Sequence, residues 1–264
     1  MLNPQKEVYK HLKRYLDWND LDDGLGKDEY LFISSIGSFN YNLQHDKSDV
    51  DTRLVYVPGL DNISNGRDQK TRQMNVGEAH MTVESIVNFK RLLMKSNPTV
   101  LEALYSRNMV LNDKYIEPFY DLIVPHWDEI PYLNPHEFFK AILGAAVSFT
   151  KKTSVKSLSH IPRMYGILVK YLEGKPFDEV LYLNDDERKM IFNIRKYEEH
   201  CDFEEEINLI REKEEEIKKI PFCDFKVYED VNKFFSEIQI LKLEENIESY
   251  REEQRDSSRW GHSW

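Results

Sequence analysis

The fold of this chain is decided by residues 37–53, Gly-Ser-Phe-Asn-Tyr-Asn-Leu-Gln-His-Asp-Lys-Ser-Asp-Val-Asp-Thr-Arg. The run before this stretch, residues 30–36, is short, rich in β-forming side chains and ended by glycine, which predicts a buried strand. Residues 50–57, Val-Asp-Thr-Arg-Leu-Val-Tyr-Val, predict a second strand. The stretch therefore joins two strands through a tight turn and a polar spacer.

The turn at Gly37 and Ser38 has the composition of an anion-binding site. Gly37 lets the backbone approach a ligand closely, and Ser38 adds a hydroxyl donor. Residues 39–43 look like the first turn of a short helix, whose free N–H groups and positive dipole end hold anions. We therefore expect a phosphate group to bind at this turn.

Asp49 and Asp51 are two residues apart on the second predicted strand, so both side chains leave the same face. Two carboxylates placed in this way repel each other unless a cation lies between them, and hard oxygen ligands suit Mg²⁺ or Mn²⁺. An isolated Asp-x-Asp is more often part of an Asx-type turn. The Gly-Ser turn a short distance upstream favours the metal site.

At these residues the chain resembles the nucleotidyltransferase superfamily that includes DNA polymerase β. The signature of that superfamily is Gly-Ser, a spacer and Asp-x-Asp on two neighbouring strands. The chain is more closely similar to the predicted nucleotidyltransferases of bacteria and tailed phages, whose pattern it matches at Gly37, Ser38, Tyr41, Leu43, Ser48, Asp49, Asp51 and Arg53. Asn42 replaces a glycine of that pattern, and asparagine tolerates a left-handed backbone better than most residues.

The resemblance extends over residues 30–215. Residues 84–107 are similar to the group's helix followed by Asn-Pro-x-x-Leu-Glu, although the Asn-Pro pair at residues 97–98 is equally a helix stop and re-entry signal. Residues 156–163 resemble the group's Lys-x-x-x-His-x-x-Arg element. The similarity is therefore broader than a single motif.

One position departs from the superfamily, which usually carries a third carboxylate on a later strand. The register of the resemblance places His80 there, with Glu78 two residues earlier on the same predicted strand face and Glu84 further along. His80 is a metal ligand, a substitute base or a surface histidine, and the sequence leaves these alternatives open. The resemblance thus implies Asp49 and Asp51 as metal ligands, with Glu78 and His80 as candidates to complete the set.

A basic segment follows in the second half of the chain. Residues 138–172 contain no acidic residue and six basic ones, although the formal net charge of the chain is −11. The simplest alternative is a solvated basic surface. An uninterrupted absence of acids over this length, in a chain with 31% charged residues, favours an anionic ligand instead.

Lys156, His160 and Arg163 within this segment are spaced i, i+4 and i+7, which puts them on one face of a helix. Pro162 is accommodated if a new helix begins near Ser159, because proline fits the first turn of a helix. The resemblance implies that the three side chains close over a triphosphate, opposite the Gly-Ser turn.

Helices dominate the rest of the chain. The fold class that we expect is α+β, with a nucleotidyltransferase core of a mixed sheet and flanking helices in residues 1–125 and a C-terminal helical bundle in residues 126–264, the active site lying in the cleft between them. Residues 61–72 are a polar insertion with the composition of a lid or substrate loop. Helices are predicted over residues 1–18, 84–96, 113–124, 135–152, 154–173, 185–199, 203–219 and 228–253.

Composition indicates an enzyme-sized protein without a membrane partner. The chain has 264 residues, no apolar run of about 18 residues that would span a bilayer, and no signal-peptide core at its start. Cys201 and Cys223 are the only cysteines and lack a metal-binding spacing, which favours a reduced cytoplasm, bacterial or that of a phage-infected host cell. Residues 201–255 hold 17 acidic and 9 basic residues, as expected of solvated helices.

The resemblance implies transfer of a nucleoside monophosphate from an NTP such as ATP to a hydroxyl acceptor, with release of pyrophosphate. Asp49 and Asp51 would be the catalytic carboxylates and hold two Mg²⁺ or Mn²⁺ ions. The residues that would bind the NTP are Gly37, Ser38, Lys156, His160 and Arg163.

The acceptor is an RNA end, a protein or a small molecule, and the acidic net charge disfavours extended nonspecific binding of nucleic acid. The alternative to an enzyme is a catalytically weak or inactive nucleotide-binding regulator, or a toxin-antitoxin-type interaction protein. The histidine at position 80 keeps this alternative open.

Overall fold

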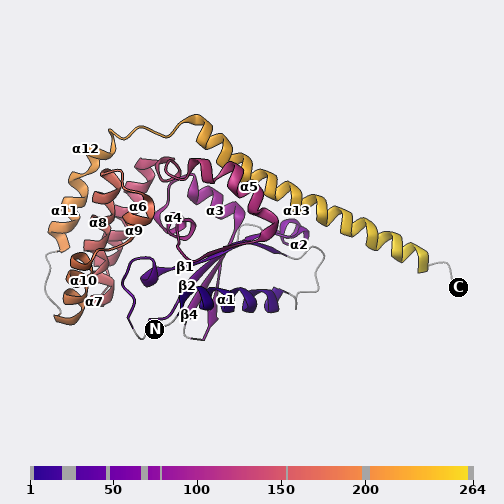
Figure 1. Cartoon of the computed structure of the whole chain (residues 1–264), viewed down its shortest axis with the longest axis horizontal. Helices are drawn as coiled ribbons and strands as arrows, with labels where there is room; N and C mark the ends of the chain where they lie inside the picture. The colour runs from indigo at the N-terminus through magenta and orange to yellow at the C-terminus, as the bar shows by residue number, and fades with distance from the viewer. Residues whose placement is uncertain are drawn as a thin grey trace.

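The computed structural model of the chain describes residues 3–19, 28–45, 48–66, 71–77, 79–152, 154–197 and 203–260. In this part of the chain, a sheet and its covering helices lie beside a second group of helices (Figure 1). A long final helix runs back along the sheet region and extends beyond it. Among these residues, no helix combines the length and the apolar character that crossing a bilayer requires.

The described strands form one mixed sheet in the order β3-β4-β2-β1-β5. β2 pairs in parallel with β4, and the other neighbours are antiparallel. Because Ile36 at the end of β1 pairs with Asp51 at the start of β2, the Gly-Ser turn and the Asp-x-Asp motif lie at the same end of the sheet. The strands are β1 (Glu29–Ile36), β2 (Asp51–Val57), β3 (Thr71–Val76), β4 (Ala79–Ser85) and β5 (Met109–Leu111).

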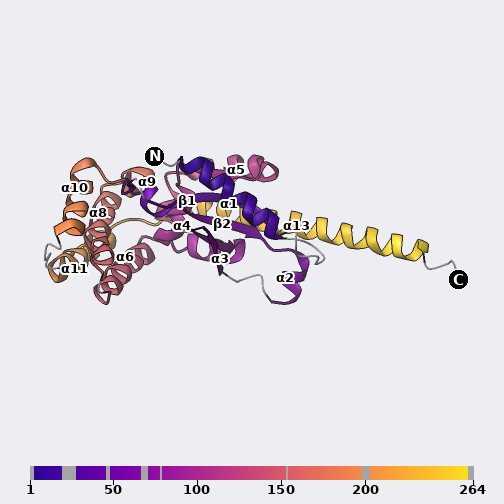
Figure 2. The same cartoon turned by 90° about the horizontal axis from the view of Figure 1, so that it is seen from below.

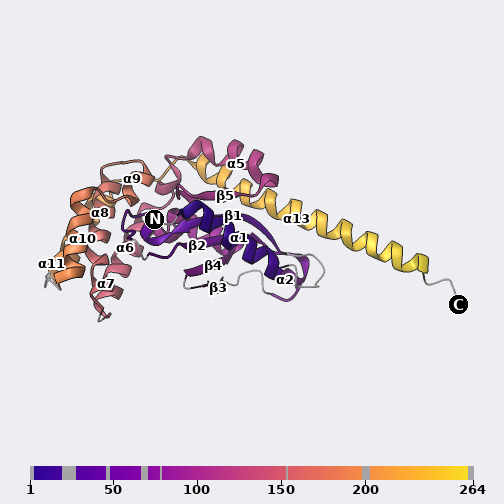
Figure 3. The ribbon, with the colours of Figure 1, turned by 60° about the horizontal axis from the view of Figure 1, so that its bottom comes forward.

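Helices cover both faces of this sheet. On one face lies α1 (Pro4–Asn19) (Figures 2 and 3). Its buried Val8, Leu12 and Tyr15 pack on apolar side chains of β1, β2 and β4. On the other face lie α3 (Ile86–Leu93) and α4 (Pro98–Leu104), which belong to a larger apolar core. Burial of apolar area on both faces explains why β1 and β2 read as apolar runs.

The second group of helices follows the sheet in sequence. α6 and α8 pack against each other and against α11, and their apolar side chains join the same core as α3 and α4. The elements are α6 (Pro135–Thr150), α7 (Val155–Leu158), α8 (His160–Leu172), α9 (Phe177–Leu181), α10 (Asp185–Tyr197), α11 (Phe203–Glu212) and α12 (Glu214–Ile217).

The last helix, α13 (Phe225–Trp260), returns to the amino-terminal region and packs against α3 and α5 (Ile116–Leu122). Phe234, Phe235 and Ile238 are buried in this contact. The far end of α13 projects away from the rest of the molecule (Figure 1). The domain boundary predicted between residues 125 and 126 stays a prediction. α13 follows this boundary in sequence, but in space it packs on the region before the boundary.

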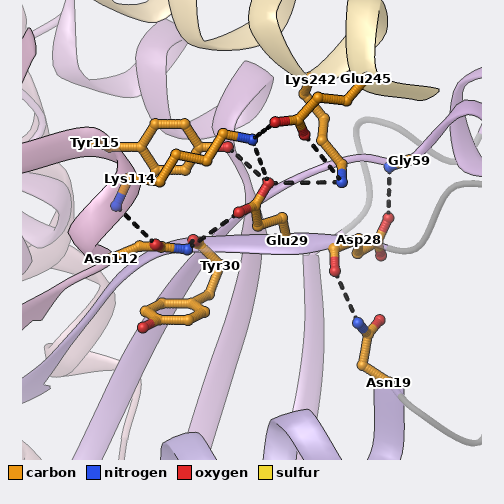
Figure 4. A network of polar contacts seen from close by, with 10 residues as sticks. All are labelled: Asn19, Asp28, Glu29, Tyr30, Gly59, Asn112, Lys114, Tyr115, Lys242 and Glu245. Carbon is orange, nitrogen blue, oxygen red and sulfur yellow. Dashed lines mark hydrogen bonds and ion pairs between the residues drawn. The ribbon is translucent and has the colours of Figure 1, made fainter. Parts of the chain in front are cut away.

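Polar contacts fasten α13 to the beginning of β1 (Figure 4). Glu29 accepts a hydrogen bond from the Tyr115 hydroxyl (2.9 Å) and forms ion pairs with Lys114 (3.1 Å) and Lys242 (3.5 Å). Lys114 also pairs with Glu245 on α13. We call these five residues the latch.

The α+β class, the mixed sheet and the C-terminal helices confirm the predicted architecture. Several expectations on local structure are wrong in detail. The polar insertion expected as a loop over residues 61–72 contains most of α2 (Leu60–Ser64) and the start of β3, and the helix predicted over residues 113–124 is a 3-10 turn, Asp113–Tyr115, followed by α5. The predicted helix over residues 154–173 is two helices, and the one over residues 203–219 is interrupted at Lys213. The short helix expected over residues 39–43 is a single 3-10 turn, Gly37–Phe39, because Asn42 takes a left-handed conformation (φ +57°) that no helix continues through.

Candidate active site

A pocket of about 450 Å³ opens where the sheet meets the second group of helices. The end of β1 and the approach to β2 form one wall, and α7, α8 and α10 form the other. The pocket, here called the anion pocket, brings together seven of the nine predicted site residues, Gly37, Ser38, Asp49, Asp51, Lys156, His160 and Arg163. Of the other two, His80 does not line the pocket and Glu78 lies outside the described residues. The anion pocket is also lined by Leu43, His45, Ser48 and Arg195.

Gly37 passes close to the Asp-x-Asp motif in a conformation that favours glycine. Its φ is +77°, and a Cβ at this position would lie 3.7 Å from Oδ2 of Asp51. Its N–H donates to Oε1 of Glu102 at 2.5 Å, so this N–H is not one of the free donors expected for an anion. Ser38 lines the pocket, and its hydroxyl has no hydrogen bond to the described residues.

Glu102 on α4 fixes the Gly-Ser turn through the hydrogen bond that it accepts from Gly37. Besides Gly37, it accepts a hydrogen bond from the Tyr41 hydroxyl at 2.6 Å. Burial raises the pKa of Glu102 above its usual value, although both hydrogen bonds and the charge of Arg163 act in the opposite direction. Glu102 ends the Asn-Pro-x-x-Leu-Glu element, but its sequence does not predict this role, because 65 residues separate Glu102 from Gly37.

The ring of Tyr41 connects Glu102 to the basic side of the pocket. The guanidinium carbon of Arg163 lies 3.9 Å from the centre of this ring, a cation-π contact. Tyr41 is buried, and burial together with the charge of Glu102 raises the pKa of its hydroxyl well above the usual value. Tyr41 therefore stays a neutral donor and a rigid platform for Arg163.

Asp49 and Asp51 both face the anion pocket. Asp49 is exposed and lies just before β2 rather than on it, whereas Asp51 is half-buried as the first residue of the strand. Oδ1 of Asp51 accepts a hydrogen bond from the backbone N–H of His80 at 3.0 Å. Oδ2 accepts none from the described residues, so each aspartate offers oxygen to a hard cation such as Mg²⁺ or Mn²⁺. The donor set fits a divalent ion at these two residues.

The third ligand of the predicted metal set stays a prediction. Glu78 lies outside the described residues. The imidazole of His80 hydrogen bonds to Oδ1 of Asn75 (2.9 Å), and Glu84 is engaged in an ion pair with Arg53 (2.8 Å). Across the described ranges, no three His, Cys, Asp or Glu side chains are grouped to share a metal ion.

The opposite wall of the anion pocket is cationic. Lys156, Arg163 and Arg195 line it, and none of the three forms an ion pair with a carboxylate in the part of the chain that the structure describes. Arg195, which the sequence analysis missed, donates from Nε to the Ser159 hydroxyl at 2.9 Å. Burial and the neighbouring Arg163 lower the pKa of Arg195. Unbalanced positive charge of this kind is stabilised by an anionic ligand.

His160 lies among these cations at the first turn of α8, which begins one residue after Ser159 as predicted. Burial and the charges of Arg163, Arg195 and Lys156 lower its pKa to about 3. The imidazole is therefore neutral at pH 7 and offers one N–H donor rather than a positive charge. Its ring packs on Phe149 with the centroids 5.0 Å apart.

Two contacts bring the spacer of the signature motif to the helical region. The side-chain amide of Asn42 donates to the carbonyl of Leu183 (3.0 Å), and Arg188 donates to the carbonyl of Gln44 (3.1 Å). Leu183 and Arg188 frame the start of α10, the helix that carries Arg195. Asn42 thus combines a left-handed backbone with a contact that the glycine of the family pattern lacks.

Residues 6–123 match the family model of RlaP, described as an RNA repair pathway DNA polymerase beta family. The match covers the five described strands, most of α1 and the helices α3 and α4, and it ends before α6. It confirms that the amino-terminal region is similar to a nucleotidyltransferase-type family, and the mixed sheet with its flanking helices is consistent with that fold. None of the curated proteins matches the chain.

Proposed function

We propose that this protein transfers a nucleoside monophosphate from an NTP to the end of an RNA, with release of pyrophosphate. The observation that carries the proposal is the anion pocket. In it, the Asp-x-Asp carboxylates face three cations that have no acidic partner among the described residues, across a space large enough for a triphosphate. The match to a nucleotidyltransferase-type family supports the same activity.

We assign different parts of phosphate binding to different residues of the anion pocket. The hydroxyl of Ser38 would donate to the terminal phosphates, which the Gly37 turn admits because glycine has no side chain there. Lys156, Arg163 and Arg195 would offset the negative charge that develops on the leaving pyrophosphate. His160, neutral at pH 7, would add one hydrogen bond.

Asp49 and Asp51 would hold the divalent cations. When bound, such ions lower the pKa of an attacking hydroxyl and neutralise charge on the triphosphate. The chain itself orients the carboxylates. The backbone N–H of His80 fixes one oxygen of Asp51, and the exposed Asp49 lines the pocket just before the strand. No protein base is required by this arrangement.

RNA is the acceptor that we favour over a protein or a small molecule, because the matched family is described as belonging to an RNA repair pathway. The net charge of −11 argues for a short RNA end rather than a long bound duplex, since nonspecific affinity rests on many phosphate contacts. The exposed Lys151 and Lys152, at the end of α6 that precedes the pocket helices, supply local positive charge for such an end.

Incubation with each α-labelled NTP and Mg²⁺ or Mn²⁺, in the presence of RNA, protein or metabolite pools, tests the proposal. Label in the RNA pool, absent with the Asp49→Asn/Asp51→Asn variant, is the expected result. Label in another pool would replace the acceptor and keep the chemistry. No label in any pool would contradict nucleotide transfer.

A second candidate is a nucleotide-binding regulator without turnover, which is favoured by the lack of a third clustered carboxylate among the described residues. Mn²⁺ accepts imidazole more readily than Mg²⁺, so an enzyme that uses His80 as a ligand should turn over faster with Mn²⁺. The variant His80→Asp should then shift the preference to Mg²⁺. ATP binding without pyrophosphate release, in both the wild type and the variant, would favour the regulator.

A further inference from the structure

A second cavity, of about 370 Å³, adjoins the anion pocket. The two spaces share Gly37, Asp51, His160 and Arg163 on their walls, so a single ligand can extend from one into the other. The volume lies within the range of small-molecule sites, about 300–1,000 Å³. We call this second cavity the apolar chamber.

The far wall of the apolar chamber is built from two helices. α6 contributes Ala141, Ala145 and Phe149, which are spaced by one turn and share a face, and α8 contributes Met164 and Ile167. The two alanines are small where most positions of a helix-packing face carry larger side chains, so α6 leaves room between itself and α4. The wall suits a flat ring with apolar faces.

Away from Asp51 and Arg163, which lie on the wall shared with the anion pocket, the charged side chains of the chamber are already engaged. Arg53 pairs with Glu84 at 2.8 Å, and Glu102 accepts hydrogen bonds from Gly37 and Tyr41. In this part of the chamber, a charged ligand group would lose its hydration without gaining a free counter-charge among the described residues. The chamber therefore favours an uncharged group, in contrast to the anion pocket beside it.

The side-chain amide of Asn97 is a neutral polar group that can meet the edge of such a ring. Oδ1 of Asn97, the N-cap of α4, accepts hydrogen bonds from both the N–H (3.0 Å) and the hydroxyl (2.9 Å) of Thr99. These two donors fix the orientation of the amide. The NH₂ group of Asn97 has no acceptor among the described residues, and Asn97 lines the chamber.

We propose that the apolar chamber binds the nucleobase of the NTP, with the amide of Asn97 donating to an acceptor on the edge of the base. This inference rests on the proposed function, because it requires the phosphates of the same NTP to occupy the anion pocket. The ring faces pack between α6 and α8, and Ala145 sets the space available to the ring.

The test compares a full nucleotide with its phosphates alone. Calorimetry with Mg²⁺ measures the affinity of ATP and of inorganic tripolyphosphate for the wild type and for Ala145→Leu, which fills the chamber. We expect Ala145→Leu to weaken ATP by about tenfold or more and to leave tripolyphosphate unchanged, since overpacking a filled site costs on this scale. Thermal unfolding shows whether the variant is folded.

Gly144→Leu is the matched control, because it adds the same side chain one residue away on α6. Outside its own helical turn, a Cβ at this exposed position meets no atom of the described residues within 4 Å. ATP affinity should be that of the wild type. Equal weakening of ATP by both variants, or none by Ala145→Leu, would overturn the nucleobase assignment.

Two further arms separate the possible failures. If a short RNA oligonucleotide, and not ATP, loses affinity in Ala145→Leu, the chamber holds the acceptor and our assignment is wrong. If neither ATP nor tripolyphosphate binds the wild type, the proposed function fails before the chamber is tested.

Asn97→Ser tests the contact to the edge of the base, because serine keeps a capping oxygen but removes the amide. The variant should change the ratio of the affinities for the four NTPs and leave the affinity for tripolyphosphate unchanged. An unchanged ratio would remove Asn97 from the proposal.

Discussion

The two ends of β1 carry charge in opposite ways. At its start, Glu29 is surrounded by Lys114, Lys242 and the Tyr115 hydroxyl, and each charge has a partner at hydrogen-bonding or ion-pairing distance (Figure 4). At its end, the Gly37 turn faces Lys156, Arg163 and Arg195, whose positive charges have no carboxylate partner in the described chain.

We infer from this difference that the latch at the start of β1 stabilises the fold, whereas the cations at the end of β1 bind a ligand. Balanced charges stabilise the contact in which they lie, as in the latch between α13 and β1. Unbalanced charges in a partly buried pocket raise the free energy of the unliganded protein, and an anion of the right charge recovers that free energy on binding. The contrast predicts that substitutions at the start of β1 change the free energy of unfolding, and that substitutions at its end change the affinity for ATP.

The largest effect is expected from Asp49→Asn/Asp51→Asn. When both carboxylates are replaced, no described acidic side chain of the anion pocket is left to hold the divalent cation that a bound triphosphate requires. The metal-dependent affinity for ATP should therefore fall by at least about 3 kcal/mol. Calorimetry with ATP and Mg²⁺ measures it, and thermal unfolding should show little change. Unchanged affinity in a folded double variant would remove the metal site.

A smaller loss of affinity is expected from Arg163→Ala. This cation faces the anion pocket, so ATP should weaken by about 1.5–3 kcal/mol, the range of a charge-assisted hydrogen bond, and AMP much less. Arg163→Lys restores the charge without the planar stacking on Tyr41, and it should recover part of the loss. Equal weakening of ATP and AMP would contradict contact with the terminal phosphates.

At the other end of β1, Glu29→Gln should lower the free energy of unfolding by about 1–2 kcal/mol, because it leaves Lys114 and Lys242 without a shared carboxylate. Urea denaturation measures this loss, and ATP affinity should stay within about twofold of the wild type. A change of ATP affinity as large as that of Arg163→Ala would contradict the separation of the two ends.

The latch also predicts a dependence on pH. Burial alone would raise the pKa of Glu29, but the hydrogen bonds from Tyr115 and Lys114 and the charge of Lys242 bring it below its usual value of 4.5. A lowered pKa stabilises the folded state above the unfolded value and loses that contribution as pH falls through the folded value. The difference in stability between wild type and Glu29→Gln should therefore be constant well above pH 4.5 and shrink below it.

The features that were predicted best from the sequence are those that depend on interactions between residues close together in the chain. The Gly-Ser turn, the strand that carries Asp51 and the start of α8 at His160 follow from glycine conformation, alternation and proline placement, and the structure agrees. Glu102 and Arg195 were missed because their roles arise only when distant segments pack together. No local pattern distinguishes a glutamate on a buried helix face that supports a turn from one that does not.

The backbone of Asn42 was predictable from the sequence and its side-chain contact was not, and the substitution Asn42→Gly has the smallest expected effect. The left-handed backbone of Asn42 follows from the family pattern, but its hydrogen bond to the carbonyl of Leu183 does not. Asn42→Gly keeps the backbone conformation and removes only the hydrogen bond, so it should cost about 0.5–1 kcal/mol in urea denaturation. Asn42→Ala should cost about 1–2 kcal/mol more, because alanine is strained at φ +57°. If the two variants were equally stable, the left-handed conformation would not explain why asparagine replaces glycine here.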